Sequence, residues 1–120
     1  MNFKEEYSFN QRKIQSESVL DKFYPQKVPV IIQKHKKDKN LQSNDKRKYL
    51  IPHDMKYSSL MITLRHRVFE NMPSSVALFL STENGTMLCH TDNILNIYDK
   101  YVDKDGFLYL YYCSENTFGH

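Results

Sequence analysis

The chain has 120 residues, of which 40% are hydrophobic and 13% aromatic, a composition typical of one globular domain and not of a disordered segment. Its net charge of +3 is modest, and its two cysteines are too few for a disulfide framework, so we expect free thiols in the cytoplasm. Residues 1–7 lack the apolar core of a secretory signal, and the longest apolar run, Phe107–Cys113, is far shorter than a membrane span. Any membrane attachment is therefore expected to come through a covalent lipid or a partner.

The amino-terminal part predicts helix and then strand. Residues 3–24 are polar, free of glycine and rich in helix formers, which indicates one or two short helices. Pro25 ends this pattern because proline cannot continue a helix. Val28–Gln33 is apolar and β-branched, as a buried strand is, and Pro29 indicates an edge or a first position in that strand.

A basic stretch follows this strand. It contains only two acidic residues, Asp38 and Asp45, but seven basic ones: Lys34, Lys36, Lys37, Lys39, Lys46, Arg47 and Lys48. Such a stretch is usually a solvated loop, although its positive field also favours acidic peptides or anionic lipid headgroups.

The middle of the chain predicts a helix among short strands. Lys48–Pro52 is expected to be a strand, and a helix over about 58–69 is expected next. One face of that helix carries its apolar side chains: Tyr57, Leu60, Met61, Leu64 and Val68. Val76–Ser81 predicts a third strand, and Asn84-Gly85 predicts a hairpin turn from which Thr86–Cys89 returns as a fourth.

The carboxyl-terminal part predicts a helix, a turn and a last strand. Asp92 is expected to cap a helix over Asn93–Tyr101. Asp105-Gly106 indicates a turn, and Phe107–Cys113 is the most strand-like segment of the chain. Residues 114–120 are polar and are not expected to pack.

The predicted order of elements is α-α-β-β-α-β-β-α-β. Without the first two helices, ββαββαβ is the order of the β-grasp (ubiquitin-like) fold. In this α+β fold a mixed sheet wraps one main helix, and the last strand runs centrally beside the first. We therefore predict a helical extension over 1–27, a ubiquitin-like core over 28–113 and a flexible tail over 114–120.

Five segments, in order along nearly the whole chain, carry a more specific pattern. They are Val28-Pro29-Val30-Ile31, Asp45-Lys46-Arg47-Lys48-Tyr49-Leu50-Ile51-Pro52, Arg65-His66-Arg67, Asp103-Lys104-Asp105-Gly106-Phe107-Leu108-Tyr109 and Ser114-Glu115-Asn116-Thr117-Phe118-Gly119. Together they resemble the GABARAP and light-chain-3 family of autophagy modifiers. The resemblance implies two helices added to a ubiquitin core, no enzymatic activity, no cofactor, and a location in the cytoplasm or, after lipidation, on autophagosome or other vesicle membranes.

The resemblance assigns the end of the chain to conjugation. A processing cysteine protease would remove His120, and E1-like and E2-like enzymes would link the Gly119 carboxyl group to the amine of phosphatidylethanolamine. Glycine suits these steps because a residue without a Cβ enters narrow channels, and residues 114–119 reach about 20 Å when extended. The alternative is a frayed terminus that ends in Gly-His by chance.

The resemblance also implies a docking surface for cargo receptors with aromatic-x-x-aliphatic motifs, which would add as a strand beside Lys48–Pro52. The pocket for the aromatic residue would be lined by Val19 or Leu20 and by Pro29, Ile31, Lys48, Leu50 and Phe107. The pocket for the aliphatic residue would be lined by Tyr49, Ile51, Pro52, Met55, Leu60, Thr63, Leu64 and Arg67. Flanking acidic residues would be attracted by Lys46, Arg47 and Lys48.

Other interpretations of this surface stay open. Lysines on an edge strand also protect against aggregation, and Ile31, Leu50 and Leu64 could be ordinary core residues. Thr63 stands where the family usually has an aliphatic residue, so the second pocket is expected to be more polar. The family's acidic residue on the second helix matches one of three positions: Gln15, Ser16 or Glu17.

The alternative function is a non-conjugated ubiquitin-fold module in membrane trafficking or cytoskeletal attachment, in which Gly119 would be dispensable. We expect no nucleic-acid partner, because aromatic residues are not interleaved with the basic stretch. We expect no metal, because the five histidines lack ligand spacing. A monomer is expected before lipidation.

Overall fold

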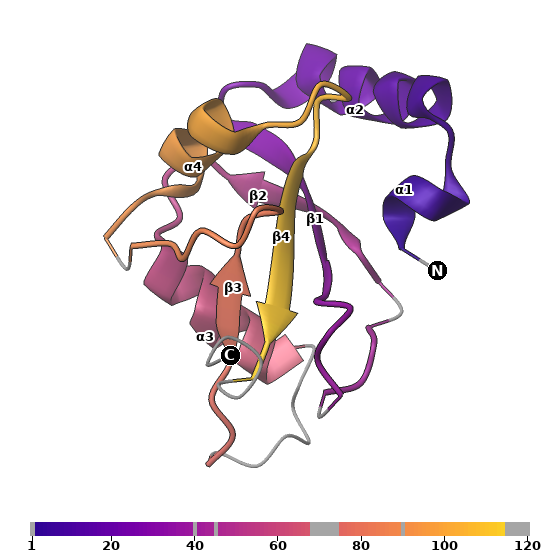
Figure 1. The fold of residues 1–120 in the computed structure, drawn as a ribbon. Helices are drawn as coiled ribbons and strands as arrows, with labels where there is room; N and C mark the ends of the chain where they lie inside the picture. The colour runs from indigo at the N-terminus through magenta and orange to yellow at the C-terminus, as the bar shows by residue number, and fades with distance from the viewer. Residues whose placement is uncertain (1, 40, 45, 68–74, 90, 115–120) are drawn as a thin grey trace.

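The computed structural model describes residues 2–39, 41–44, 46–67, 75–89 and 91–114 (Figure 1). The helices are α1 (Phe3–Glu6), α2 (Phe9–Phe23), α3 (Tyr57–Arg67) and α4 (Ile94–Tyr101). The strands are β1 (Lys27–Lys34), β2 (Lys48–Pro52), β3 (Phe79–Ser81) and β4 (Leu108–Cys113). The prediction for α3 extended to residue 69, and its last two positions lie outside the described residues.

The strands form one sheet in the order β2-β1-β4-β3. β1 runs parallel to β4, with Val30 opposite Leu108, and the two outer pairs are antiparallel. The last strand therefore lies beside the first at the centre of the sheet. This arrangement confirms the α+β, ubiquitin-like fold class.

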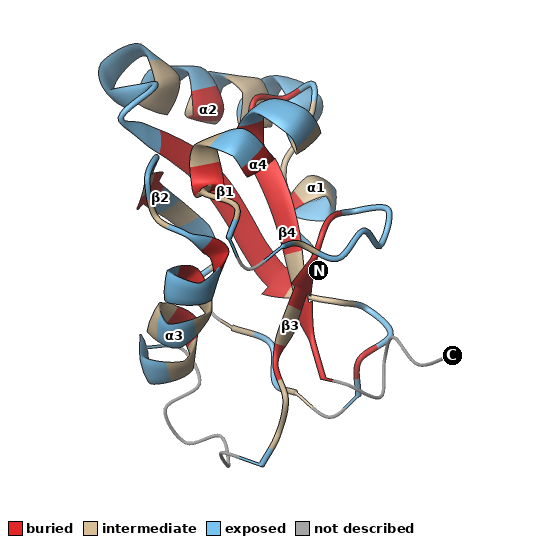
Figure 2. Cartoon of the chain, turned by 90° about the vertical axis from the view of Figure 1, so that its left-hand side faces the viewer, coloured by how far each residue is buried: buried red, intermediate tan, exposed pale blue. Residues whose placement is uncertain are grey.

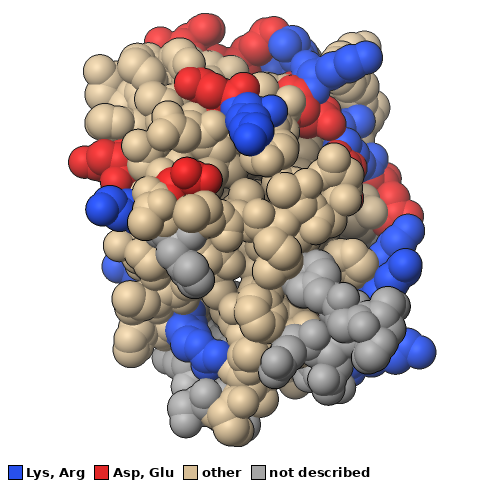
Figure 3. Space-filling model, turned by 60° about the vertical axis from the view of Figure 1, so that its left-hand side comes forward, with Lys and Arg blue, Asp and Glu red and all other residues tan. Residues whose placement is uncertain are grey.

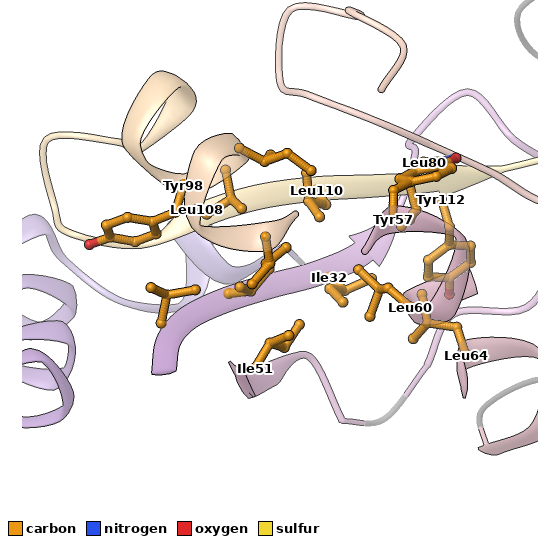
Figure 4. Packing of buried hydrophobic residues seen from close by; sticks show 14 of the residues in the cluster. Ile32, Ile51, Tyr57, Leu60, Leu64, Leu80, Tyr98, Leu108, Leu110 and Tyr112 are labelled. Atoms are coloured by element: carbon orange, nitrogen blue, oxygen red, sulfur yellow. The ribbon is translucent and has the colours of Figure 1, made fainter. Parts of the chain in front are cut away.

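Helices cover both faces of the sheet, and Figure 2 shows α3 and α1 on opposite sides of the strands. Successive residues of a strand point to opposite faces. Val30 and Ile32 of β1 accordingly join the main core with α3 and α4, whereas Ile31 joins a smaller cluster under α1. Figure 4 shows Ile32 of the main core close to Leu60 of α3.

The smaller cluster attaches the amino terminus to the sheet. Phe3 of α1 is 3% exposed and packs with Ile31, Phe107 and Tyr109, its ring centroid lying 5.3 Å from that of Phe107. The Phe3 N–H donates to Gln33 Oε1 at 3.0 Å. The first helix is therefore part of the packed domain.

A buried carboxylate ties α2 to the turn before β4. Asp105 is fully buried, and its Oδ2 accepts from Arg12 Nη1 at 2.6 Å and from the Tyr109 hydroxyl at 2.5 Å. Its Oδ1 accepts from the Phe107 N–H at 2.9 Å, and the Ser16 hydroxyl donates to its carbonyl oxygen. A buried charge is costly unless it is well hydrogen-bonded, so this network holds α2 in one position.

The predicted strand Thr86–Cys89 is wrong, because only an isolated bridge joins Ser81 to Met87 in this part of the chain. The turn itself forms, with φ of 88° at Gly85. The Thr82 hydroxyl accepts from the Thr86 N–H and lies 2.6 Å from Asn84 Oδ1. Backbone hydrogen bonds from the Thr82 N–H to the Thr86 carbonyl and from the Gly85 N–H to the Thr82 carbonyl, both 3.0 Å, close the turn together with these side-chain contacts.

Three smaller predictions are also corrected. β3 begins at Phe79 and not at Val76, whose carbonyl oxygen instead accepts from Arg65 of α3. Asn93, and not Asp92, caps α4 by accepting from the Asn96 N–H at 2.9 Å. Ser114, predicted to be unpacked tail, is 5% exposed.

Gly106→Ala is expected to lower the free energy of unfolding by about 2–4 kcal/mol. Gly106 has φ of 94°, and a Cβ there would lie 2.9 Å from Ser16 Cβ and closer still to its Oγ. Gly85 has a similar φ of 88° and no atom within 4 Å of such a Cβ, so Gly85→Ala is the control and should lose only about 1–2 kcal/mol. Urea unfolding measures both variants, and equal losses would contradict the contact with Ser16.

Ion pairs link Lys4 of α1 to Asp103, in the turn before β4, and to Glu83. Lys4 Nζ lies 2.8 Å from Asp103 Oδ1 and 2.9 Å from Glu83 Oε1. Burial acts to raise the pKa of Asp103, but the hydrogen bonds from Lys4 and from the Asp105 N–H outweigh burial and hold this pKa below its ordinary value of 3.8.

The docking of α1 is therefore expected to weaken in acid. A carboxyl whose pKa is lowered by folding stabilises the fold above its ordinary pKa, and this contribution is lost as the pH falls through the lower, folded value. Between about pH 5 and pH 2, the wild type should lose up to about 1 kcal/mol more stability than Asp103→Asn. Urea unfolding across this range tests the difference, and parallel curves for the two proteins would count against it.

Candidate functional site

β2 lies at one edge of the sheet, where its outer backbone groups can pair with another strand. Its register places Pro52 opposite Lys27 and Lys48 opposite Ile31. Leu50 is 38% exposed although it is apolar, while the next residue, Ile51, is buried. An edge strand with an exposed apolar side chain is suited to accept an apolar peptide.

A cavity of about 580 Å³ lies between β2 and α3. Its lining consists of Asn44, Lys46, Tyr49, Leu50, Ile51, Pro52, Met55, Leu60, Thr63, Leu64 and Arg67. We call this cavity the β2–α3 groove. The eight residues predicted to form the aliphatic pocket are all in its lining, and its volume falls within the range of about 300–1,000 Å³ of small-ligand sites.

Asn44 is a lining residue that the sequence analysis missed. Its N–H donates to the Tyr112 hydroxyl at 2.9 Å, and its side-chain amide donates to the Ile32 carbonyl at 3.0 Å. The same amide also donates to the Lys46 carbonyl, and these bonds attach the basic loop to the core beside the groove. The contacts with Ile32 and Tyr112 were missed because both residues are distant from Asn44 along the chain.

Several of the residues predicted for the aromatic pocket are buried. Ile31 and Phe107 have no exposed surface and pack with Phe3, and Pro29 is also buried. Lys48 and Leu50 are exposed. The buried members thus form a floor beside the exposed face of β2.

Leu20 and Val19 differ in their packing. Leu20 is half-buried and packs against the main core. Its Cδ1 lies 3.5 Å from the position that a Cβ would take if Gly106 were an alanine. Val19 is half-buried as well, but it is not among the residues packed against that core. Val19 and Leu20 thus differ in their packing, and both stay candidates for the wall that α2 would contribute.

The structure also distinguishes the three candidates for the polar position on α2. Lys48 Nζ donates to Gln15 Oε1 at 3.0 Å, so Gln15 faces β2. Ser16 is buried against the Asp105 carbonyl, and Glu17 lies 3.7 Å from Lys13 on its own helix. A neutral amide thus faces Lys48, which keeps the full charge of this lysine available to an acidic peptide.

Two polar groups of the groove are already satisfied. The Thr63 hydroxyl donates to the Ser59 carbonyl at 3.0 Å, so it adds less polarity to the groove than the sequence suggests. The Tyr49 hydroxyl donates to the Lys46 carbonyl at 3.1 Å. Burial raises the pKa of Tyr49, so this phenol stays protonated and remains a donor at neutral pH.

A second apolar surface lies on the other side of α3. Figure 3 shows the side of the molecule that carries α3 and α4, where uncharged side chains fill the centre. A cavity of about 420 Å³ there includes Ile62 of α3, Phe79 of β3 and Met87. β3 has three residues and is bridged at Ser81 to Met87, so it offers a shorter edge than β2.

The proposed conjugation residues Gly119 and His120 lie outside the described residues, which end at Ser114. In the part of the chain that the structure describes, no group of three or more His, Cys, Asp or Glu side chains could hold a metal ion. No described helix is long and apolar enough to span a bilayer.

The model of the family described as "Autophagy protein Atg8 ubiquitin like" matches residues 11–119. The chain belongs to the Atg8 family. Autophagy-related protein 8 of Saccharomyces cerevisiae is 39% identical over 117 residues, which cover 98% of this chain and 96% of that protein. Autophagy-related protein 8 of Candida glabrata is 38% identical over 119 residues, which cover 99% and 97%. The crystal structure of Trypanosoma brucei ATG8 gives a TM-score of 0.85 at 33% identity, covering 99% of this chain and 98% of that one.

Membership in the Atg8 family makes this chain an autophagy protein of the ubiquitin-like class. It is a non-enzymatic modifier. Family membership also implies partners from a conjugation pathway.

Proposed function

We propose that this Atg8-family chain is cleaved after Gly119, is linked through Gly119 to phosphatidylethanolamine, and recruits cargo receptors and autophagy factors with aromatic-x-x-aliphatic motifs. The observation that carries the recruiting function is the β2–α3 groove beside an edge strand. The conjugating function is supported by family membership and by a glycine near the end of the sequence. The chain would move from the cytoplasm to autophagosome or other vesicle membranes.

A peptide of this kind fits the geometry of β2. Residues three apart in an extended strand are about 10 Å apart, so one peptide can reach two neighbouring pockets. Its aliphatic residue would enter the β2–α3 groove. Its aromatic residue would lie near Lys48 and Leu50, over the floor formed by Ile31 and Phe107. Lys46 would attract acidic residues next to the motif.

Conjugation requires little of the chain beyond an accessible carboxyl group. The protease would hydrolyse the peptide bond between Gly119 and His120. The E1-like enzyme would then activate the Gly119 carboxylate with ATP as an acyl adenylate, releasing pyrophosphate. An enzyme cysteine thiolate would displace AMP to form a thioester, and the lipid amine would displace that thiolate to form an amide. The domain supplies recognition, and the partner enzymes supply the catalytic cysteines.

Leu50→Ala is expected to weaken binding of an acidic aromatic-x-x-aliphatic peptide roughly tenfold, because it removes apolar surface at the centre of the contact. Val102→Ala is the matched control, since Leu50 and Val102 are both 38% exposed but Val102 caps the end of α4. Backbone NMR shifts measured during peptide titration report the binding site. Wild-type shifts should concentrate at Lys48–Pro52.

Absence of shifts at β2, or equal weakening by both variants, would contradict the recruiting function. The alternative, a binding module that is not conjugated, makes a different prediction. It requires that peptide binding persist while Gly119→Ala has no effect on membrane association in cells.

A further inference from the structure

The residue that follows β4 is held by a carboxylate from a distant loop. Ser114 is 5% exposed, and its N–H donates to Asp38 Oδ2 at 2.5 Å. Its hydroxyl donates to the same oxygen at 2.8 Å. Cys113, just before it, pairs with Phe79 of β3. The segment that leads to Gly119 therefore starts from a fixed point.

Asp38 lies in the basic stretch that follows β1, and its side chain is buried, with only 1% of the residue exposed. Its Oδ1 accepts from the Leu41 N–H at 2.9 Å, so both carboxylate oxygens are engaged. Lys34 Nζ donates to the Asp38 carbonyl oxygen at 2.5 Å. A buried carboxylate needs such hydrogen bonds to offset its desolvation, so releasing Ser114 carries a penalty.

The loop that carries Asp38 is itself held by β4. The Tyr112 hydroxyl donates to the Gln42 carbonyl at 2.7 Å and accepts from the Asn44 N–H at 2.9 Å. Tyr112 has no exposed surface, so these bonds attach the loop to the core. The Asp38–Ser114 contact thus joins two fixed parts of the molecule.

We propose that Asp38 is a positioning residue for conjugation: by holding Ser114, it sets the direction and reach with which residues 115–119 enter the partner enzymes. This role rests on the proposed conjugation at Gly119. If Ser114 were released, an enzyme would have to order an additional residue each time it bound the chain. That ordering is an entropic penalty, so Asp38 acts mainly on enzyme affinity and less on the chemical step.

The test uses purified processing and conjugation enzymes with vesicles that contain phosphatidylethanolamine. Asp38→Asn keeps the side-chain shape but replaces one acceptor oxygen with a donor, so it cannot satisfy both Leu41 and Ser114. Ser114→Ala removes only the hydroxyl bond. Asp21→Asn makes the same change in net charge as Asp38→Asn at an exposed position of α2, and serves as the control.

The expected effect is on KM. The KM of the E2-like enzyme for the chain should rise roughly five- to tenfold with Asp38→Asn and about two- to threefold with Ser114→Ala. The kcat should stay within about twofold, and Asp21→Asn should match the wild type. Amide hydrogen exchange at Ser114 should be slow in the wild type and fast in Asp38→Asn, while the affinity of the β2–α3 groove for its peptide stays the same.

Fast exchange at Ser114 in the wild type would overturn the proposal, and so would equal KM values for Asp38→Asn and the wild type. A matching loss of peptide affinity in Asp38→Asn would overturn it as well, because it would show a general loosening of the fold. If the wild type itself is never conjugated, the proposed conjugation fails and this role of Asp38 falls with it. Conjugation of the wild type with no effect of Asp38→Asn overturns only the role of Asp38.

Discussion

Asp105→Ala is expected to lower the free energy of unfolding by about 3–5 kcal/mol, the usual effect of breaking a buried ion pair. Arg12 points at this carboxylate from α2 at 2.6 Å, and its side chain is only 12% exposed. Without Asp105, the Arg12 guanidinium would be a buried charge with its closest acceptor removed. The Tyr109 hydroxyl and the Phe107 N–H would lose the same acceptor. A loss of this size is a large part of the stability of a small domain.

The matched control is Asp21→Ala, because Asp21 is exposed on the same α2 that carries Arg12. It should change stability by less than about 0.5 kcal/mol. Arg12→Met combined with Asp105→Leu should recover much of the loss, since apolar replacements leave no buried charge. Urea unfolding followed by circular dichroism suits a chain without tryptophan. A loss below about 1 kcal/mol for Asp105→Ala would contradict the role of this network.

Gly119→Ala is expected to reduce lipid conjugation by roughly a hundredfold or more, because a Cβ displaces the carboxyl group in channels shaped for glycine. The measurement is the fraction of the chain that becomes vesicle-bound in the presence of the processing and conjugation enzymes. Gly119 lies outside the described residues, so folding and peptide binding serve as internal checks and should match the wild type.

His120→Ala is the control for this variant. The proposed cleavage removes residue 120 whatever its side chain, so His120→Ala should be conjugated at a rate close to that of the wild type. Conjugation of Gly119→Ala at the wild-type rate would show that the lipid is attached elsewhere or that the chain is not lipidated.

The two elements that border the β2–α3 groove could be predicted from regular periodicities, whereas the residues of its lining were predicted from the resemblance to the autophagy modifier family. The strand pattern of Lys48–Pro52 gives β2 its bounds, and the helical spacing from Leu60 to Leu64 gives α3 its buried face. Ile51 of β2 packs in the same core as Leu60 and Leu64 of α3, on one face of the sheet, and Thr63 lies with these residues in the lining of the groove.

The features that could not be predicted depend on contacts between residues that are distant in the sequence. Asp38 lies among lysines, a pattern typical of a solvated loop, yet it is buried and accepts two hydrogen bonds from Ser114. Phe3 belongs to a polar amino-terminal segment and still docks against Phe107. No local periodicity records such pairs. The wrongly predicted strand at Thr86–Cys89 has the opposite cause, because the local turn signal was correct but the pairing it suggested stops at the single bridge between Ser81 and Met87.

We propose that this chain becomes a lipid-linked modifier through Gly119. The most direct test of this proposal is the intact mass of the chain purified from membranes of cells in which autophagy has been induced, with fragmentation to locate the modification. We expect a chain that has lost His120 and carries one phosphatidylethanolamine on the Gly119 carboxyl group. A membrane-bound chain that retains His120 and carries no lipid would contradict it.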